Sequence, residues 1–341
     1  MCRSVPTVYT GGSPEAPPSS PFSFSDMALS PRTVVQRGAL AVIGALALTL
    51  FFSTLGRTVE VEHHRTATGE AHVVSVSQST NDTVLLKKRF SVRDGDRLDL
   101  NLGSDEVTVE TIRGTTAEVI IEGTGRNARE VFERRDYQVF HRDGTLTVRT
   151  KPRRNGSWRS ERDAEFAVTV RIPERFDASI DLGSGDVRLD RIAGDVTIDT
   201  GSGDLQLGDV RGGAIRLDTG SGDVDVDRLD GSSIVIDTGS GEVSVGQLTG
   251  RARISTGSGD VELATDGEHA LDIDTGSGEV TVRLPRGLDA DLVASGGDVR
   301  VDRALDFRGT ERDRSARGTF GSGGPRIAID TGSGDISVRS R

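Results

Sequence analysis

The side chains with the clearest potential for chemistry in this chain are repeated carboxylates. The string G-S-G-[DE] recurs, with its first glycine at Gly183, Gly201, Gly220, Gly239, Gly257, Gly276 and Gly332, and residues 295–298 form a degenerate copy, SGGD. Its acidic positions are Asp186, Asp204, Asp223, Glu242, Asp260, Glu279, Asp298 and Asp335. Carboxylate oxygens are preferred ligands of Ca²⁺. These residues are therefore candidate calcium ligands.

Calcium-binding β-rolls offer a comparison, because their G-G-x-G-x-D-x-U-x nonapeptides form coils of 18 residues. In this chain the acidic residue follows G-S-G directly, and the other half of each coil lacks a second Gly/Asp turn. Carboxylates stacked at about 4.8 Å repel by about 0.9 kcal/mol even in a water-like dielectric. Loosely bound Ca²⁺ would relieve this repulsion, and so would ordinary salt. We expect no other cofactor.

A second acidic pattern is the tetrad D-T-G-S, which is also an active-site signature of aspartic proteases. It occurs in the repeats at Asp199, Asp218, Asp237, Asp274 and Asp330. A protease needs two carboxylates that meet and share a proton. Aspartates at one position of successive repeats would instead line one edge, where Asp and Thr side chains bond turn amides. We favour this structural role.

Carbohydrate cleavage is a further alternative, because carboxylates are plentiful and they carry out glycoside hydrolysis. Residues 178–302, however, contain no Phe, Trp or Tyr, so this region offers no aromatic platform for a sugar. No irregular group of carboxylates, Lys and Arg interrupts the repeat. We expect no catalytic residues, and a carbohydrate-active β-helix enzyme stays as the alternative.

The spacing of the repeats predicts the architecture. Successive copies lie 18 or 19 residues apart, and apolar residues alternate with polar ones beside each turn. Such alternation is typical of half-buried strands. One short coil buries little apolar surface, so neighbouring coils must stack. We predict an all-β fold, a single-stranded parallel-type β-solenoid with 18–19-residue coils over residues 177–341. Its narrow corner is filled by Ile192, Val210, Leu229 and Leu248.

Residues 84–176 are also β-rich but less regular, and we interpret them as a capping module for the open edge of the solenoid. They contain apolar strand patterns, a hairpin signal at Asp143-Gly144 and a short helix near residues 127–135. A weak relative of the turn, Gly103-Ser104-Asp105-Glu106, lies in this module.

The carboxyl-terminal end departs from the repeat. We expect an irregular loop at residues 303–324, followed by a closing hairpin over residues 327–338. The loop is rich in arginines that are candidates for an anionic polymer or lipid, or for pairing with the acidic repeats: Arg303, Arg308, Arg312, Arg314 and Arg317.

The amino-terminal region has the pattern of a targeting segment. Residues 38–56 are uncharged and mostly apolar, and at 1.5 Å per residue a helix of this length spans a bilayer. Residues 27–57 are therefore a signal peptide or a retained membrane anchor. Residues 1–26 are disordered or precede the true start, and residues 58–83 are a linker. We expect an exported protein, either secreted or anchored facing the periplasm or the exterior.

Composition narrows the classes of partner. The chain has 53 acidic and 42 basic residues, a net charge of -11, and residues 178–302 alone carry 25 acidic and 10 basic residues. Nucleic acid is therefore excluded as a partner, because phosphate binding needs a basic surface. A single cysteine excludes an internal disulfide framework. The expected partner is an envelope or surface protein or polymer.

Several of these segments resemble one family. The repeats LDTGSGDVDVDRLDG and IDTGSGEVSVGQLTG, the segment RFSVRDGDRLDLNLGSDEVTVE and the ending GTFGSGGPRIAIDTGSGDISVRSR are similar to the bacterial putative-adhesin domain of unknown function. The resemblance covers roughly residues 88–341. It implies a secreted or membrane-tethered, non-enzymatic β-solenoid of the bacterial envelope that acts in adhesion, scaffolding or envelope-stress sensing. It brings no catalytic or binding residues. A calcium-dependent surface module is the other alternative.

Overall fold

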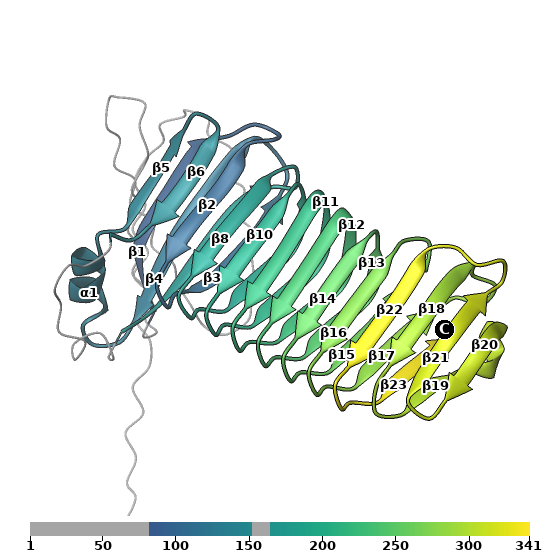
Figure 1. Ribbon diagram of the computed structural model, residues 1–341. Coiled ribbons are helices and arrows are strands. Elements are labelled where there is room, and N and C mark those ends of the chain that lie inside the picture. Colours follow the sequence, from purple (N-terminus) through teal and green to yellow (C-terminus); the bar gives the residue numbers. More distant parts are fainter. Residues whose placement is uncertain (1–81, 152–163) are drawn as a thin grey trace, which may run out of the picture. The chain divides into compact units, whose positions relative to one another are not determined.

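The computed structural model describes residues 82–151 and 164–341 (Figure 1). Within these ranges the regular structure is β-strand, apart from helix α1 (Ala128–Arg135) and a 3₁₀ turn at Arg303–Leu305. The strands form one hydrogen-bonded system of 23 strands with parallel and antiparallel pairings. The predicted all-β class and the short helix near residues 127–135 are confirmed. The open, mixed, many-stranded sheet has a solenoid-like form.

The predicted hydrophobic helix at residues 38–56 lies outside the described residues, as do the targeting region and the linker up to residue 81. In the part of the chain that is described, no helix has both the length and the apolar character needed to cross a membrane.

Each repeat contributes one strand that enters the G-S-G turn and one strand that leaves it. We call these the leading and trailing strands, and one such pair with its turn a rung. The leading strands stack in parallel in the order β2 (Arg97–Leu102), β8 (Asp177–Leu182), β10 (Val196–Thr200), the ends of β11 (Leu205–Thr219) and β12 (Val224–Thr238), β14 (Ala252–Thr256), β16 (Leu271–Thr275), β22 (Arg326–Thr331) and β18 (Ala290–Ser295).

The trailing strands form a second parallel face. Their order is β3 (Glu106–Ile112), β9 (Val187–Ala193), the beginnings of β11 and β12, β13 (Val243–Thr249), β15 (Val261–Thr265), β17 (Val280–Leu284), β23 (Ile336–Ser340) and β19 (Val299–Val301). Register partners on adjacent rungs include Val187 with Leu205, and Leu205 with Val224. Figure 1 shows these strands side by side along the stack.

The core lies between the two faces and is built from columns of aliphatic side chains. Ile198, Leu217, Ile236 and Ile254 are successive register partners, and all four are buried. The predicted corner is confirmed as a second column, because Ile192, Val210, Leu229 and Leu248 are also register partners and buried. Period-two alternation therefore places one apolar side chain above another on every rung, which removes these side chains from water.

At the amino-terminal end the stack continues through residue 177 into the capping module. Strands β2 and β3 form a rung, and they pair in parallel with β8 and β9. Beyond this rung, the leading face ends in the hairpin of β6 (Thr145–Arg149) and β5 (Gln138–Arg142), which confirms the signal at Asp143-Gly144. The trailing face ends in β7 (Glu165–Pro173), β4 (Thr116–Thr124) and β1 (Asp82–Ser91), and the last two pairings are antiparallel.

At the carboxyl-terminal end the order of the rungs differs from their order in the sequence. Strands β22 and β23 lie between the rung of β16 and β17 and the rung of β18 and β19. The predicted closing hairpin over residues 327–338 is therefore wrong, because these two strands pair with different faces. The repeat of β22 and β23 has the full D-T-G-S-G-D motif, and its turn stacks on the intact turn of the β16 and β17 rung. The degenerate copy at residues 295–298 occupies the outer rung, where it has only one turn to match.

The predicted irregular loop at residues 303–324 is instead mainly a β-hairpin. Strands β20 (Phe307–Arg312) and β21 (Ser315–Phe320) pair in antiparallel fashion, and β21 also pairs with β18. The hairpin covers the outer edge of the leading face, and the apolar side chains of Phe307 and Phe320 contact each other across it, with ring centroids 5.3 Å apart. An antiparallel hairpin protects a sheet edge that would otherwise be open to strand addition.

A short loop then carries the chain from β21 back across the end of β18 to β22. Residues 321–325 form this crossover, and Gly321 and Gly323 have positive φ angles of 54° and 79°. The Asp289 carboxylate accepts hydrogen bonds from the backbone N–H (2.7 Å) and the hydroxyl (2.9 Å) of Ser322. These bonds hold the pKa of Asp289 below its usual range. Asp289 therefore fixes the loop that permits the insertion.

We predict that Asp289→Ala loosens this crossover, because Ser322 loses the acceptor for both of its hydrogen bonds. Amide hydrogen exchange over residues 321–328 should become several-fold faster at neutral pH, with little change in rungs further along the stack. Asp313→Ala is the matched control, because Asp313 is an exposed carboxylate in the turn of the neighbouring hairpin. Equal exchange in both variants would contradict this role of Asp289.

Candidate functional site

The G-S-G turns stack so closely that their backbones leave no room for side chains. A Cβ atom placed on Gly241 would lie 1.8 Å from the carbonyl oxygen of Gly222 on the preceding rung. The threonine of each D-T-G-S tetrad is buried beside this contact. The Thr238 hydroxyl donates to the carbonyl oxygen of Gly222 (3.2 Å) and accepts from the backbone N–H of Gly241 (3.0 Å). Both polar groups of the turn are thereby satisfied inside the stack.

The predicted calcium ligands lie in one column along this turn edge, and their carboxylates bond the next rung. Asp186 Oδ1 accepts from the N–H of Asp204 (3.0 Å), and Asp204 Oδ1 accepts from the N–H of Asp223 (2.9 Å). Asp223 and Asp260 bond the N–H groups of Glu242 and Glu279 in the same way, and Asp335 bonds the N–H of Asp298. Among the described residues, the carboxylates of Glu242 and Glu279 accept no such bond from the next rung. Their side chains are longer than that of Asp by one methylene.

This column therefore has a structural role that does not depend on a cation. In the described ranges no three or more His, Cys, Asp or Glu side chains are grouped so as to hold a metal ion. Calcium binding along the column stays a prediction.

The aspartates of the D-T-G-S tetrads lie on the outer surface of the leading face. Asp199, Asp218 and Asp237 are successive register partners, and Asp274 and Asp330 pair further along the same column. Arg216 bridges two of them, with its guanidinium 2.7 Å from Asp218 Oδ2 and 3.4 Å from Asp237 Oδ2. The carboxylates follow one another along an edge, as expected, instead of facing each other as a proton-sharing pair.

One buried charged cluster lies where the turn ladder ends. In the rung of β2 and β3, Asp105 stands in register with Gly185, the third residue of the next turn. Its side chain is fully buried, and Oδ1 accepts from Arg135 and from the Tyr137 hydroxyl (3.0 Å). Oδ2 is buried without a hydrogen-bond partner. Burial raises the pKa of Asp105, although Arg135 opposes the shift.

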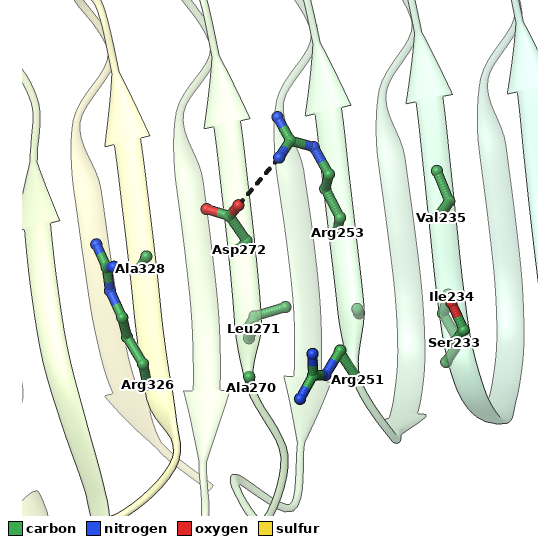
Figure 2. A pocket seen from close by; sticks show the side chains of 11 residues that line it. Ser233, Ile234, Val235, Arg251, Arg253, Ala270, Leu271, Asp272, Arg326 and Ala328 are labelled. Atoms are coloured by element: carbon green, nitrogen blue, oxygen red, sulfur yellow. Dashed lines mark hydrogen bonds and ion pairs between the residues drawn. The ribbon is translucent and has the colours of Figure 1, made fainter.

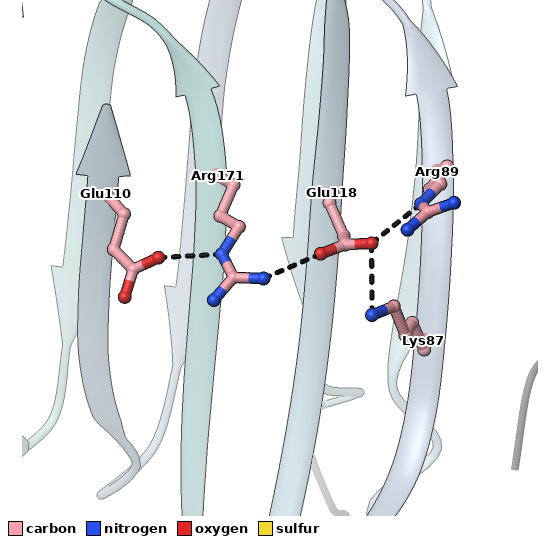
Figure 3. Close-up of polar contacts among 5 residues, drawn as sticks. All are labelled: Lys87, Arg89, Glu110, Glu118 and Arg171. Atoms are coloured by element: carbon pink, nitrogen blue, oxygen red, sulfur yellow. Dashed lines mark hydrogen bonds and ion pairs between the residues drawn. The ribbon is translucent and has the colours of Figure 1, made fainter. Parts of the chain in front are cut away.

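A network of charges joins the capping strands to the first rung (Figure 3). Glu118 on β4 accepts from Arg89 (2.7 Å) and Lys87 (3.2 Å) on β1 and from Arg171 on β7 (2.9 Å). Arg171 also donates to Glu110 on β3 (2.7 Å). Burial by itself would raise the pKa of Glu118, but the hydrogen bonds and positive charges of these neighbours lower it below its usual 4.5. Four neighbouring strands are thereby connected.

A groove on the outer surface of the leading face differs from the acidic surface around it (Figure 2). We call it the arginine groove. Its cavity of about 370 Å³ is lined by Ser233, Ile234, Val235, Arg251, Ala252, Arg253, Ala270, Leu271, Asp272, Arg326 and Ala328. Arg253 pairs with Asp272 at 3.3 Å. Arg251 and Arg326 lie on either side of Ala270 in Figure 2, with exposed side chains.

Sequence reasoning missed the arginine groove and the Asp105 cluster. The arginines that it did select lie at the hairpin end, where Arg308 pairs with Asp306 (3.4 Å) and Arg314 donates to the carbonyl oxygen of Gly296 (3.3 Å). Aligning the repeats by their 18–19-residue offset would have placed Arg251 and Ala270 in one column. It would not have placed Arg326 beside them, because β22 is inserted out of sequence order.

The comparison with protein families decides the identity of this fold. The family described as Toastrack DUF4097 matches residues 96–339. The chain belongs to the Toastrack DUF4097 family. The resemblance to a putative-adhesin domain of unknown function is thereby confirmed, and the match covers the first rung, the repeats and the inserted strands. A comparison with curated proteins gives no match.

Several solved structures are similar to this Toastrack chain. A putative adhesin from Bacteroides fragilis is 12% identical over 75% of this chain and 96% of its own, with a TM-score of 0.44. A putative adhesin from Parabacteroides distasonis is 15% identical over 77% of this chain and 98% of its own, with a TM-score of 0.41. A third chain, a putative lipid binding protein from the same species, is 13% identical over 76% of this chain and 98% of its own, with a TM-score of 0.32.

We predict that Thr238→Val destabilises the Toastrack stack by about 1–3 kcal/mol, because a buried carbonyl and a buried N–H lose their shared partner. The valine keeps the shape of the side chain. Urea denaturation measures the change, and Ser240→Ala in the same turn is the control, because Ser240 is exposed. If both variants unfold at the same urea concentration, the threonine ladder is not a source of stability.

We predict that Glu118→Gln destabilises the capping strands by about 1–2 kcal/mol at neutral pH, because two oxygens that accept from three cations become one neutral amide. A lowered pKa means that this stabilisation is present above the usual Glu pKa of 4.5 and is lost as pH falls through the pKa of the folded state. The difference between wild type and variant should therefore shrink on acidification.

Thermal unfolding of both proteins between pH 3 and pH 7 measures this dependence. Glu122→Gln is the control. Glu122 lies on the same strand as Glu118, four residues further along, and therefore on the same face of the strand. A destabilisation by Glu118→Gln that stays constant over the pH range would show that charge is not its cause.

Proposed function

We propose that this chain is an exported, non-catalytic Toastrack protein of the bacterial cell envelope, adhesin-like, which acts in adhesion, scaffolding or envelope-stress sensing. One observation carries the proposal: the repeated Thr and Asp side chains of the turns bond the neighbouring rung. Most of the carboxylates that looked like metal ligands are thus used to hold the stack together. What the stack offers to a partner is the exposed surface of its two faces.

The arrangement of carboxylates supports a non-catalytic role. Each turn aspartate occupies an equivalent place and bonds an equivalent amide, as in the series Asp186, Asp204 and Asp223. Glycoside hydrolysis and aspartic proteolysis both need two carboxylates whose environments push their pKa values apart. A periodic column gives its members similar environments, so no pair of them is set apart from the rest.

The direction of the chain supports presentation of the stack away from a membrane. The described chain begins in β1, at one end of the stack, and its carboxyl terminus lies towards the other end (Figure 1). With residues 38–56 as an anchor, the amino-terminal end of the stack would be nearest the membrane. The remaining rungs would then be accessible to a surface protein or polymer.

We predict that a carboxyl-terminal tag on the full chain is exposed outside the cytoplasm. Protease treatment of intact cells should remove the tag if the stack is on the surface, or should do so only after the outer envelope is opened if the stack is periplasmic. Protection in spheroplasts would contradict export. Leu46→Arg/Leu48→Arg is the matched variant, because two charges in the apolar run prevent insertion, and Leu46→Ile/Leu48→Ile is its control.

The non-catalytic part of the proposal has a separate test. The purified full chain is incubated with polygalacturonate, alginate and a casein substrate, and we expect no new reducing ends and no peptide cleavage. Turnover that is lost in Asp218→Asn/Asp237→Asn would overturn this part and would make the D-T-G-S column catalytic.

A further inference from the structure

We infer that the arginine groove binds a sugar that carries one carboxylate or phosphate group. This inference deepens the proposed function and rests on it only for the accessibility of the groove. The groove combines two guanidinium groups that face solvent, the small side chain of Ala270 between them, and the aliphatic side chains of Val235 and Ala328 in the next outer column. Neither Arg251 nor Arg326 has an ion-pair or side-chain hydrogen-bond partner within residues 82–151 and 164–341.

The register explains how the groove forms. Ile234, Ala252, Leu271 and Ile327 are successive partners on β12, β14, β16 and β22. The residues that precede them, Ser233, Arg251, Ala270 and Arg326, therefore form one outer column. Arg251 and Arg326 are separated by one rung, so their backbones are about 10 Å apart. The Ala270 side chain between them is a single methyl group, which leaves a notch between two long basic side chains.

The chemistry of the lining fits an oxyanion. A guanidinium presents a planar fork of N–H donors that matches carboxylate or phosphate oxygens, and such bonds are shorter and stronger than neutral ones. In Figure 2 the Arg251 side chain extends towards Ala270, whereas the Arg326 side chain runs along its strand towards Ala328. Both side chains are long and exposed, so their guanidinium groups can turn towards the notch and share a single anion. The neighbouring Arg253–Asp272 ion pair is already formed, so it adds polar groups to the rim without competing strongly for the anion.

The rest of the lining fits the body of a sugar. Val235 and Ala328 are half-buried in the next outer column, where they are register partners of Arg253 and Asp272. They form an aliphatic surface for the C–H groups of a ring, whereas the hydroxyl groups of the sugar can stay in water at the open side. A cavity of about 370 Å³ lies at the small end of the range for ligand pockets, roughly 300–1,000 Å³.

Charge around the groove favours one anionic unit over a polyanion. Residues 178–302 carry 25 acidic and 10 basic side chains. Asp291 is the register partner of Arg326 on β18, and Asp237 and Asp274 lie on the same outer face. A long polyanion would meet these carboxylates on leaving the groove and be repelled. A single charged sugar, free or within a neutral chain, avoids them.

The test is a titration of the full purified chain with glucuronate, glucose 6-phosphate and glucose, followed by isothermal calorimetry and by amide chemical shifts. We expect one or both anionic sugars to bind in the millimolar range and glucose to bind at least about tenfold more weakly. Which anion binds more tightly distinguishes a carboxylate from a phosphate ligand. If neither anionic sugar binds at concentrations 20-fold above this millimolar range, the inference is overturned. The proposal that the protein is exported would not be affected by that result.

Two variants locate the site. Arg251→Ser/Arg326→Ser should weaken binding of the anionic sugar at least about tenfold, because both guanidinium groups are lost. Ala270→Leu keeps every charge but fills the notch, and it should weaken binding comparably. Arg339→Ser is the control, because Arg339 is an exposed arginine on β23, on the trailing face. If Arg339→Ser weakens binding as much, or if Ala270→Leu leaves it unchanged, the groove is not the site.

Discussion

The close approach of successive G-S-G turns is the constraint on which the rest of this structure depends. At the second glycine of the motif, the backbone lies so near the preceding rung that a Cβ atom on Gly203 would be 1.8 Å from the Gly185 carbonyl oxygen. Rungs that meet this closely keep a fixed register, because a shift would bring a side chain into the turn. The fixed register in turn stacks Ile on Leu in the core and Asp on Asp at the edge.

Stacking like charges has a cost, and the structure offsets it locally. Neighbouring carboxylates at the turn edge repel, but Asp186, Asp204 and Asp223 each accept a backbone N–H from the next rung. An amide donor favours the ionised carboxylate. Aspartate thus completes the backbone hydrogen bonding of the turn, and the same hydrogen bonds offset the repulsion between neighbouring carboxylates. Where Glu242 or Glu279 replaces Asp, the described structure has no equivalent bond.

Much of the fold could be predicted because the repeat is written directly in the sequence. The period, the strand alternation and the corner column of Ile192 and Val210 follow from residues that recur in order. The position of β22 and β23 could not be predicted in this way, because sequence spacing gives an order along the chain and not an order in the stack. The signals were local and indirect: a degenerate turn at residues 295–298 and a glycine-rich crossover at residues 321–325.

The candidate sites were harder to predict for the same reason. Asp105 breaks the glycine pattern of the turn, and it does so at the end of the ladder, where Arg135 and Tyr137 replace another turn as its neighbours. Its buried Oδ2 and raised pKa mark a charge that the repeat itself does not require. The exception was visible in the sequence, but its partners come from the end of helix α1 and from the residue just before strand β5 in the capping module.

The arginine groove depends on the inserted rung. If β18 followed β16 in the stack, as sequence order implies, Asp291 would occupy the place beside Ala270 that Arg326 occupies. The column would then read Ser, Arg, Ala, Asp, and an anion would meet a carboxylate across the notch. Insertion of β22 changes the sign of that charge. The insertion of one rung out of sequence order therefore also creates the basic groove on a mainly acidic face, and for this reason the groove could not be read from spacing alone.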